Sequence, residues 1–213
     1  MRFLEAKHHR QGRSQKVRVI VIHTMEAPKD VGRAWACANY FANVTKPEVS
    51  AHYCVDNKEV VQCVKDEDAA WHAGPANAFS VGIELSGYAK QTPDEWKDAY
   101  NTAMLKNAAD LVRSLCKKYG IPMVRLTPAQ LKAGASGIVG HVDVNSAFGK
   151  GDHTDPGRNF PWDRFMSMVR GSAVALGGGA LAGAAAGFLV GGPVGAAAGA
   201  GLGFITARTI KRA

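Results

Sequence analysis

Short β-branched runs alternate with helix signals between residues 16 and 170, and no other feature narrows the possible folds as much. Residues 17–22 are almost continuously apolar and β-branched, as in a strand that is buried on both faces. Residues 50–55 and 60–64 flank a polar turn and are expected to pair as a β-hairpin. Two more short strands are expected, over 81–85 and 137–141.

Capping patterns mark the helices that separate these strands. Residues 92–95 read TPDE, with Thr92 as the N-cap, proline at the first helical position and a glutamate three residues on. This pattern predicts a helix that begins at Thr92 and ends at Gly120. Shorter helices are expected at three other places: 33–44, after a second capping pattern at 127–130, and 162–169. The alternation predicts a single α/β domain over 16–170, with a central mixed β-sheet flanked by helices.

The composition changes abruptly after Arg170. Residues 171–207 contain no charged side chain and consist mostly of glycine and alanine. Glycine recurs at a strict four-residue period from Gly179 to Gly203, which on a helix gathers these glycines in one stripe. We therefore expect a glycine-zipper tail over 171–213, a Gly/Ala-rich helical segment that associates with a membrane or with itself. A disordered tail and helices packed on the domain stay open as alternatives.

The net charge of +8 lies at the two ends of the chain. Residues 1–18 carry a net charge of +5 and residues 170–213 of +4, whereas residues 19–169 sum to −1. Such basic ends favour binding to anionic polymers or to membrane surfaces, or they serve as solubilising tails. At the N-terminus we expect a basic arm over 1–15.

The cysteines and the N-terminus bear on the cellular compartment. Cys37, Cys54, Cys63 and Cys116 form no CxxC pair, and the first residues lack the apolar run of a secretory signal. Synthesis in the cytoplasm without a signal peptide and buried free thiols are therefore expected. A disulfide between Cys54 and Cys63 stays open, because both fall in the expected hairpin.

Histidines and aspartates gather at two places in the second half of the chain. The run GHVD at 140–143 is followed by HTD at 153–155. Together with His23, which ends the first buried strand, these runs offer two imidazoles and a carboxylate. That ligand set suits a catalytic zinc ion, which takes three protein ligands and keeps a fourth position open.

Six short motifs resemble those of the zinc-dependent N-acetylmuramoyl-L-alanine amidases of type 2, whose fold is shared with peptidoglycan recognition proteins and many phage endolysins. The matching motifs extend from about Val19 to Phe165 and cover essentially the whole α/β domain. They are HT at 23–24, VSAHY at 49–53, AWHAG at 70–74, SVGIEL at 80–85, GHVD at 140–143 and DPG at 155–157. Each motif alone is weak, whereas six in this order and spacing are specific.

The resemblance implies roles for individual residues. By position, the zinc ligands are His23, His141 and Asp155, and Glu84 is the general acid and base. His153 falls where many relatives have a lysine that stabilises the oxyanion, and a protonated or donating histidine can do the same. The residues implied to bind substrate are Trp71, His72, Ala73, Gly74 and Arg158, with packing of Trp71 in the core left open.

The implied activity is hydrolysis of the amide bond between N-acetylmuramic acid and L-alanine in peptidoglycan or a muropeptide, with Zn²⁺ as cofactor. Zinc lowers the pKa of its water toward about 7 and polarises the carbonyl. Glu84 takes the water proton and later delivers it to the leaving amine, while His153 helps to stabilise the oxyanion. No nucleic-acid partner is expected.

Three roles are compatible with this chemistry. The first, which we expect, is a phage-type bacteriolytic endolysin, because an absent export signal and a glycine-period tail both suit one. The second is a cytosolic amidase that recycles muropeptides, which has no evident need for residues 171–207. The third is a non-catalytic peptidoglycan-binding module, and the joint presence of three ligands and Glu84 argues against it.

Overall fold

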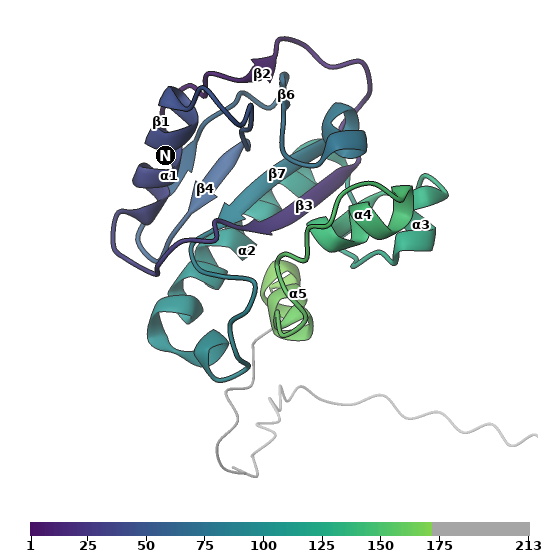
Figure 1. Cartoon of the computed structure of the whole chain (residues 1–213). Helices are drawn as coiled ribbons and strands as arrows, with labels where there is room; N and C mark the ends of the chain where they lie inside the picture. The colour runs from purple at the N-terminus through teal and green to yellow at the C-terminus, as the bar shows by residue number, and fades with distance from the viewer. Residues whose placement is uncertain (172–213) are drawn as a thin grey trace, which may run out of the picture. The chain divides into compact units, whose positions relative to one another are not determined.

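A computed structural model describes residues 1–171 of the chain (Figure 1). Its strands are β1 (Arg2–Phe3), β2 (His9–Arg10), β3 (Val19–Thr24), β4 (Tyr53–Val55), β5 (Val60–Gln62), β6 (Ala69–Ala70), β7 (Ser80–Leu85) and β8 (Gly137–Gly140). Its α-helices are α1 (Arg33–Asn43), α2 (Ala99–Tyr119), α3 (Pro128–Lys132), α4 (His141–Phe148) and α5 (Trp162–Arg170). Two 3₁₀ turns, η1 (Gly74–Phe79) and η2 (Glu95–Lys97), complete the elements.

Six strands form a mixed sheet in the order β1-β5-β4-β7-β3-β8. Strand β3 lies parallel to both β7 and β8, and β4 is parallel to β7, whereas β4 and β5 form the expected antiparallel hairpin. The central strand β3 is buried along its whole length, as its apolar sequence predicted. The expected α/β domain with a mixed sheet flanked by helices is confirmed (Figure 1).

Helices cover both faces of the sheet. On one face, α2 and α5 pack on alternate residues of β3 and β7, including Ile20, Ile22 and Ile83. On the other face, α1 packs near β4 and β5, while α3 and α4 pack near β3 and β8. The side chains that β3 and β7 direct to this second face near their carboxyl ends therefore emerge between α1 and α4.

The N-terminal residues contribute strands to the domain. Strand β1 lies parallel to β5 at the edge of the six-stranded sheet, and β2 pairs antiparallel with β6. Arg13 is partly buried and donates hydrogen bonds to the carbonyl oxygens of Asp66, Asn77 and Ser80. Residues 1–15, expected as a basic arm, thus run across the domain and are tied to it at several points.

The long helix does not begin at Thr92 as its capping pattern predicted. Thr92 and Glu95 do exchange the hydrogen bonds of a capping box, but only the short turn η2 follows. The backbone becomes extended at Asp98, whose side chain accepts from the amide of Asn101 and caps α2. Buried Trp96 provides the reason, because its carbonyl oxygen accepts from Arg164 instead of from a helical amide.

Strand β8 ends one residue earlier than expected, and helix α4, which the sequence analysis did not predict, starts at His141. The carboxylate of Asp143 accepts from the amide of Gly140 at 2.6 Å, which satisfies a free donor at the helix N-terminus. The helix stops at Gly149, which has a positive φ of 64°. An acid three residues after Gly140 and a glycine at 149 were the sequence signals for the start and the end of this helix.

The four cysteines are free thiols in the described part of the chain. Cys54 and Cys63 lie on the hairpin with their sulfur atoms 3.6 Å apart, beyond a disulfide bond length. The expectation of buried free thiols is therefore confirmed for Cys54, Cys63 and Cys116, while Cys37 is partly exposed.

The expected glycine-zipper tail lies, beyond its first residue Gly171, outside the described residues, so membrane association and self-association stay predictions. Among residues 1–171 no helix combines the length and apolar character needed to cross a bilayer.

Candidate metal centre

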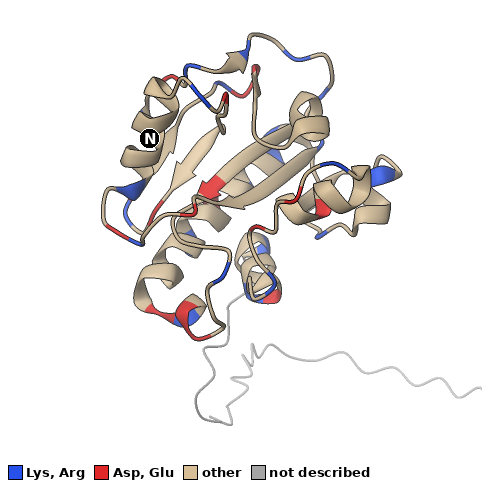
Figure 2. Ribbon diagram, in the orientation of Figure 1, with Lys and Arg blue, Asp and Glu red and all other residues tan. Residues whose placement is uncertain are grey.

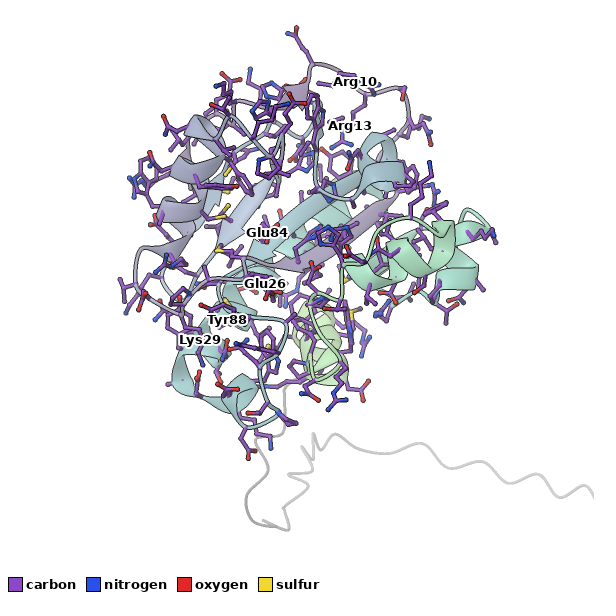
Figure 3. All side chains as sticks on the ribbon, viewed as in Figure 1. Arg10, Arg13, Glu26, Lys29, Glu84 and Tyr88 are labelled. Atoms are coloured by element: carbon purple, nitrogen blue, oxygen red, sulfur yellow. The ribbon has the colours of Figure 1, made fainter. Side chains whose placement is uncertain are left out.

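Two neighbouring strands direct His23 and Glu84 to the same face of the sheet. The two residues are register partners in the parallel pair β3–β7. Because side chains at one level of adjacent strands point to the same side, both emerge on the face that carries α1 and α4. Glu84 is the only charged residue of β7, red in Figure 2 and labelled in Figure 3.

The other two candidate ligands come from the segment that follows β8. His141 is the first residue of α4, directly after the strand end. Asp155 lies in the loop before α5, and its carbonyl oxygen accepts from the amide of Val142 at 3.0 Å. Gly157 allows this loop to lie close to the backbone of Ala89, because a Cβ there would lie 1.8 Å from the carbonyl oxygen of Ala89.

The structure brings His23, His141 and Asp155 together. The Nδ1 atom of His23 lies 3.0 Å from Oδ2 of Asp155, and the Nδ1 atom of His141 lies 3.3 Å from Oδ1. One ligand atom from each residue lies within 4.8 Å of the others, and all three residues are buried. Within residues 1–171 this is the one such group of metal-ligating side chains. Two imidazole nitrogens and a carboxylate fit a zinc site with one open position.

The electrostatics of the three residues suit a cation. Burial lowers the pKa of His23, although the hydrogen bond to Asp155 opposes this, so its imidazole is neutral near pH 7. Burial alone would raise the pKa of Asp155, but hydrogen bonds with His141 and His23 hold that pKa below its usual range. Asp155 is thus ionised and His23 is neutral, and these are the protonation states that metal binding requires.

Glu84 has an unusual environment for a carboxyl group. Its Oε2 atom is buried and has no hydrogen-bond partner among the described residues. Burial, followed by the negative charges of Asp155 and Glu26, raises the pKa of Glu84 well above its ordinary value. Glu26 lies close to it in Figure 3, in the loop after β3. A raised pKa and an unpaired oxygen beside the candidate ligands are features of a group that exchanges protons.

His153 lies on the solvent side of the centre. Its ring stacks on that of His141 with centroids 4.0 Å apart, and its Nδ1 atom lies 3.6 Å from Oδ1 of Asp155. Its side chain is 58 % exposed. The residue is thus next to the ligands and can reach a bound molecule.

The other predicted site residues line two separate hollows. Trp71, His72, Ala73 and Gly74 line one of about 380 Å³, together with His141 and His153. Trp71 is partly exposed and stacks on His8, so it does not lie in the core. Arg158 is exposed and lines a different hollow of about 650 Å³, together with Val142 and Thr154.

A layer of buried polar groups that the sequence analysis did not assign lies behind His23. The Nε2 atom of His23 lies 3.0 Å from Nδ1 of His72, and the Nε2 atom of His72 lies 3.1 Å from Oγ of Ser80. Gly82 on β7 leaves room for the His72 ring, because a Cβ there would lie 2.5 Å from Cγ of His72. A glycine between Ser80 and Glu84 in a buried strand was the available signal of such a close approach.

His52 extends this layer on the side away from the centre. Its Nδ1 atom accepts from the amide of Gly82 at 3.0 Å, and Arg13 approaches its Nε2 atom at 2.6 Å. Burial, with the positive charge of Arg13, lowers the pKa of His52 to about 3. His52 is therefore a neutral structural support and lies outside the group of candidate ligands.

Gly82→Ala is expected to destabilise the protein by about 1–3 kcal/mol, because the new methyl group overlaps the His72 ring. Chemical denaturation of the single variants and of the Gly82→Ala/His72→Ala double variant measures the effect. The smaller side chain at 72 removes the overlap. The double variant should therefore lose less unfolding free energy than the two single variants lose in sum. Strict additivity would contradict the close contact.

The raised pKa of Glu84 predicts a pH-dependent stability of the metal-free protein. Because the folded pKa lies above the unfolded value of about 4.5, the folded state binds the proton more tightly. The contribution of Glu84 is complete below pH 4.5 and is lost as the pH rises through the folded pKa. Urea denaturation should therefore show Glu84→Gln gaining stability relative to the wild type as the pH rises. A difference that does not change with pH would contradict the raised pKa.

Comparisons with known proteins agree with the resemblance of the motifs. Residues 13–158 match the family model described as N-acetylmuramoyl-L-alanine amidase. The chain is 26 % identical over 171 residues to N-acetylmuramoyl-L-alanine amidase A of Achromobacter lyticus, covering 74 % of this chain and 86 % of the relative. It is 30 % identical over 140 residues to 1,6-anhydro-N-acetylmuramyl-L-alanine amidase AmpD of Haemophilus influenzae, covering 62 % of this chain and 64 % of the relative.

A solved structure has the same fold. The crystal structure of a selenomethionine derivative of AmpD superposes with a TM-score of 0.57 at 25 % sequence identity. The match covers 79 % of this chain and 93 % of that chain. The matched family span contains every candidate ligand as well as Glu84, His153 and Arg158.

Proposed function

Because the chain belongs to the N-acetylmuramoyl-L-alanine amidase family, we propose that it uses a zinc ion held by His23, His141 and Asp155. The protein is a peptidoglycan amidase, a hydrolase that acts on a linear amide. The bond cut in this proposal joins N-acetylmuramic acid to L-alanine of the stem peptide.

The convergence of the three ligand atoms within 4.8 Å carries the proposal. The ligands come from β3, the start of α4 and the loop before α5, so three remote segments meet in one buried place. The set of two imidazoles and one carboxylate favours zinc over magnesium or calcium, which prefer oxygen ligands.

Glu84 and His153 supply the proton transfers and the charge stabilisation. When bound, a zinc ion supplies Lewis acidity that polarises a carbonyl oxygen and acidifies water. Glu84 accepts the proton of the attacking water and returns it to the leaving amine, and its raised pKa suits both steps. His153 donates to the oxygen that becomes negative in the transition state.

The hollow lined by Trp71, His72, Ala73 and Gly74 is proposed to bind substrate on one side of the centre. Trp71 offers a partly exposed aromatic face and His153 a polar tip, as a sugar-peptide substrate needs. In the second hollow, the exposed guanidinium of Arg158 binds a carboxylate of the stem peptide.

The cellular role depends on whether the enzyme prefers the intact cell wall or soluble muropeptides as its substrate. We predict lysis of the intact cell wall, supported by the tail sequence over 171–213. Likeness to AmpD, named for a 1,6-anhydro-N-acetylmuramyl-L-alanine activity, favours recycling of soluble muropeptides as the second candidate. Release of dyed fragments from sacculi, compared with hydrolysis of soluble anhydro-muropeptides, separates the two roles. Fractionation of the full chain against a chain ending at Arg170 tests the tail.

Chelation tests the proposed cofactor. Purified protein should release from peptidoglycan stem peptides that begin with L-alanine. This activity should be lost on dialysis against a strong chelator and should return with one equivalent of zinc. The products are identified by mass spectrometry. Activity that survives complete removal of metal would refute the zinc proposal while leaving the family assignment intact.

A further inference from the structure

Residues 4–10, which we call the N-terminal strap, precede the span 13–158 that matches the family model. Ala6 anchors the strap, because its side chain is buried in the core beside α1 and its amide donates to the carbonyl oxygen of Cys63 at 2.8 Å. Further along the strap, β2 pairs with β6, beside which it lies in Figure 1. The strap is therefore fixed to the domain on both sides of His8.

Strand pairing places His8 opposite Trp71. In the antiparallel pair β2–β6, His9 is the register partner of Ala70. The next pair of residues in this register is His8 with Trp71. Their rings are stacked, with centroids 5.9 Å apart and an angle of 28° between the ring planes. Stacked rings on paired strands stabilise each other's orientation.

A hydrogen bond orients the His8 ring. Its Nε2 atom lies 2.8 Å from the carbonyl oxygen of Val44, at the end of α1. A carbonyl oxygen can only accept, so Nε2 donates, and the bond restricts rotation of the imidazole. His8 is thus an oriented ring against which the indole of Trp71 packs.

The main chain of Trp71 is fixed as well. Its amide donates to Oγ of Ser50 at 3.0 Å, and its carbonyl oxygen accepts from the amide of Ser50 at 3.1 Å. With the backbone held, rotation about the side-chain torsions is the main freedom left to Trp71, and the stack with His8 restricts it. Trp71 is still partly exposed and lines the hollow of about 380 Å³, so the uncovered part of its ring is open to a bound molecule.

We propose that His8 is a positioning residue for substrate binding, which holds the indole of Trp71 in one orientation as a surface for the sugar ring of the substrate. This inference rests on the proposed function of the hollow. A side chain that is already oriented loses less conformational entropy when a ligand binds, which favours affinity.

The two hollows differ in a way that favours the sugar at Trp71. The charged residues that line the second hollow are Lys90 and Arg158, both cationic, as suits the carboxylates of a peptide. The hollow at Trp71 is lined instead by two amides and by charges of both signs, on Asn77, Asn145, Glu48 and Lys150. Donors and acceptors around an aromatic side chain suit the hydroxyl and acetamido groups of a sugar.

Nitrogen-15 NMR of the indole groups in the purified full chain tests the stack itself. The chain has four tryptophans, and the signal of Trp71 is the one missing from Trp71→Phe. His8→Ala should increase the motion of the Trp71 indole, measured by relaxation, and leave the other three indoles unchanged. Equal motion in the wild type and in His8→Ala would overturn the inference.

His9→Ala is the matched control for the strap. His9 is also partly buried, and its Nδ1 atom donates to the carbonyl oxygen of Ala6 at 2.9 Å. Its replacement should leave the Trp71 indole as rigid as in the wild type. The same increase in motion as in His8→Ala would show that the strap as a whole, and not the His8 ring, orients the indole, which would contradict the proposed role.

Steady-state hydrolysis of a soluble muropeptide gives a second readout. His8→Ala should raise KM by about 3–10-fold and leave kcat within about twofold, because the stack acts on binding. His8→Phe keeps a flat ring in the stack and should have a KM between those of His8→Ala and the wild type. An unchanged KM, a loss confined to kcat or no rescue by phenylalanine would contradict the role.

The His8→Ala/Trp71→Ala double variant separates positioning from direct contact. If His8 acts through the indole, its replacement should not change KM further once Trp71 is alanine. A loss of the same size in both backgrounds would show that His8 touches the substrate itself. The Trp71 indole signal also reports muropeptide binding without turnover, so a wild type that hydrolyses nothing would refute the proposed function and still allow this inference to be tested.

Discussion

Glu84→Gln is expected to bind zinc with the affinity of the wild type and to lose roughly 10²–10⁴-fold in kcat, the usual contribution of a general acid and base. Glutamine keeps the shape of the side chain but can neither take a proton from water nor return one to the leaving amine. The loss should appear in kcat with little change in KM, because the carboxyl group acts in the transition state.

Steady-state hydrolysis of a muropeptide, followed by chromatography of the released peptide, measures this loss. Glu67→Gln makes the same chemical change at an exposed position and should keep full activity. Zinc content by elemental analysis shows that the centre is intact in both variants. A Glu84→Gln protein with zinc bound and near wild-type kcat would remove Glu84 from the reaction.

Asp155→Ala is expected to lose the zinc ion and, with it, at least about 10³-fold in activity, because several kcal/mol of transition-state stabilisation depend on the metal. The carboxylate contacts His23 and His141 and is the one negatively charged member of the ligand set. Without it, two neutral imidazoles remain, and zinc affinity falls with the number of ligands and their charge.

Asp152→Ala is the matched control for this variant. Asp152 is exposed in the same loop, three residues before Asp155, and should keep both zinc and activity when replaced. Zinc retention by Asp155→Ala at one equivalent after gel filtration would show that the ion is held elsewhere.

The fold was predictable where local patterns and tertiary contacts agree. The buried β-branched run gave β3, and the hairpin followed from two strands around a polar turn. The start of α2 was predicted wrongly, because two capping residues, Thr92 and Asp98, compete and the contact between Trp96 and Arg164 decides between them. Such a contact joins residues 68 positions apart, which no local pattern contains.

The candidate ligands were identifiable from short motifs, whereas the residues that pack against them and hydrogen-bond to them were not. The spacing of His23, His141 and Asp155 in the sequence does not give the distances between their side chains. Only the resemblance to the family assigned the three residues to one metal site. Ser80 and Gly82 stand in a quoted motif, yet their roles depend on the His72 ring lying across the strand. The hydrogen-bond contacts that join His23, His72 and Ser80 require the register of β3 against β7, which only the structure supplies.

Diffraction data collected at the zinc absorption edge, from crystals grown with one equivalent of zinc, test whether His23, His141 and Asp155 hold the ion. If the three candidate ligands hold the ion, one strong anomalous peak is expected at about 2.0–2.2 Å from Nδ1 of His23, Nδ1 of His141 and a carboxylate oxygen of Asp155. A zinc peak bound by other residues, or none at these three, would contradict it.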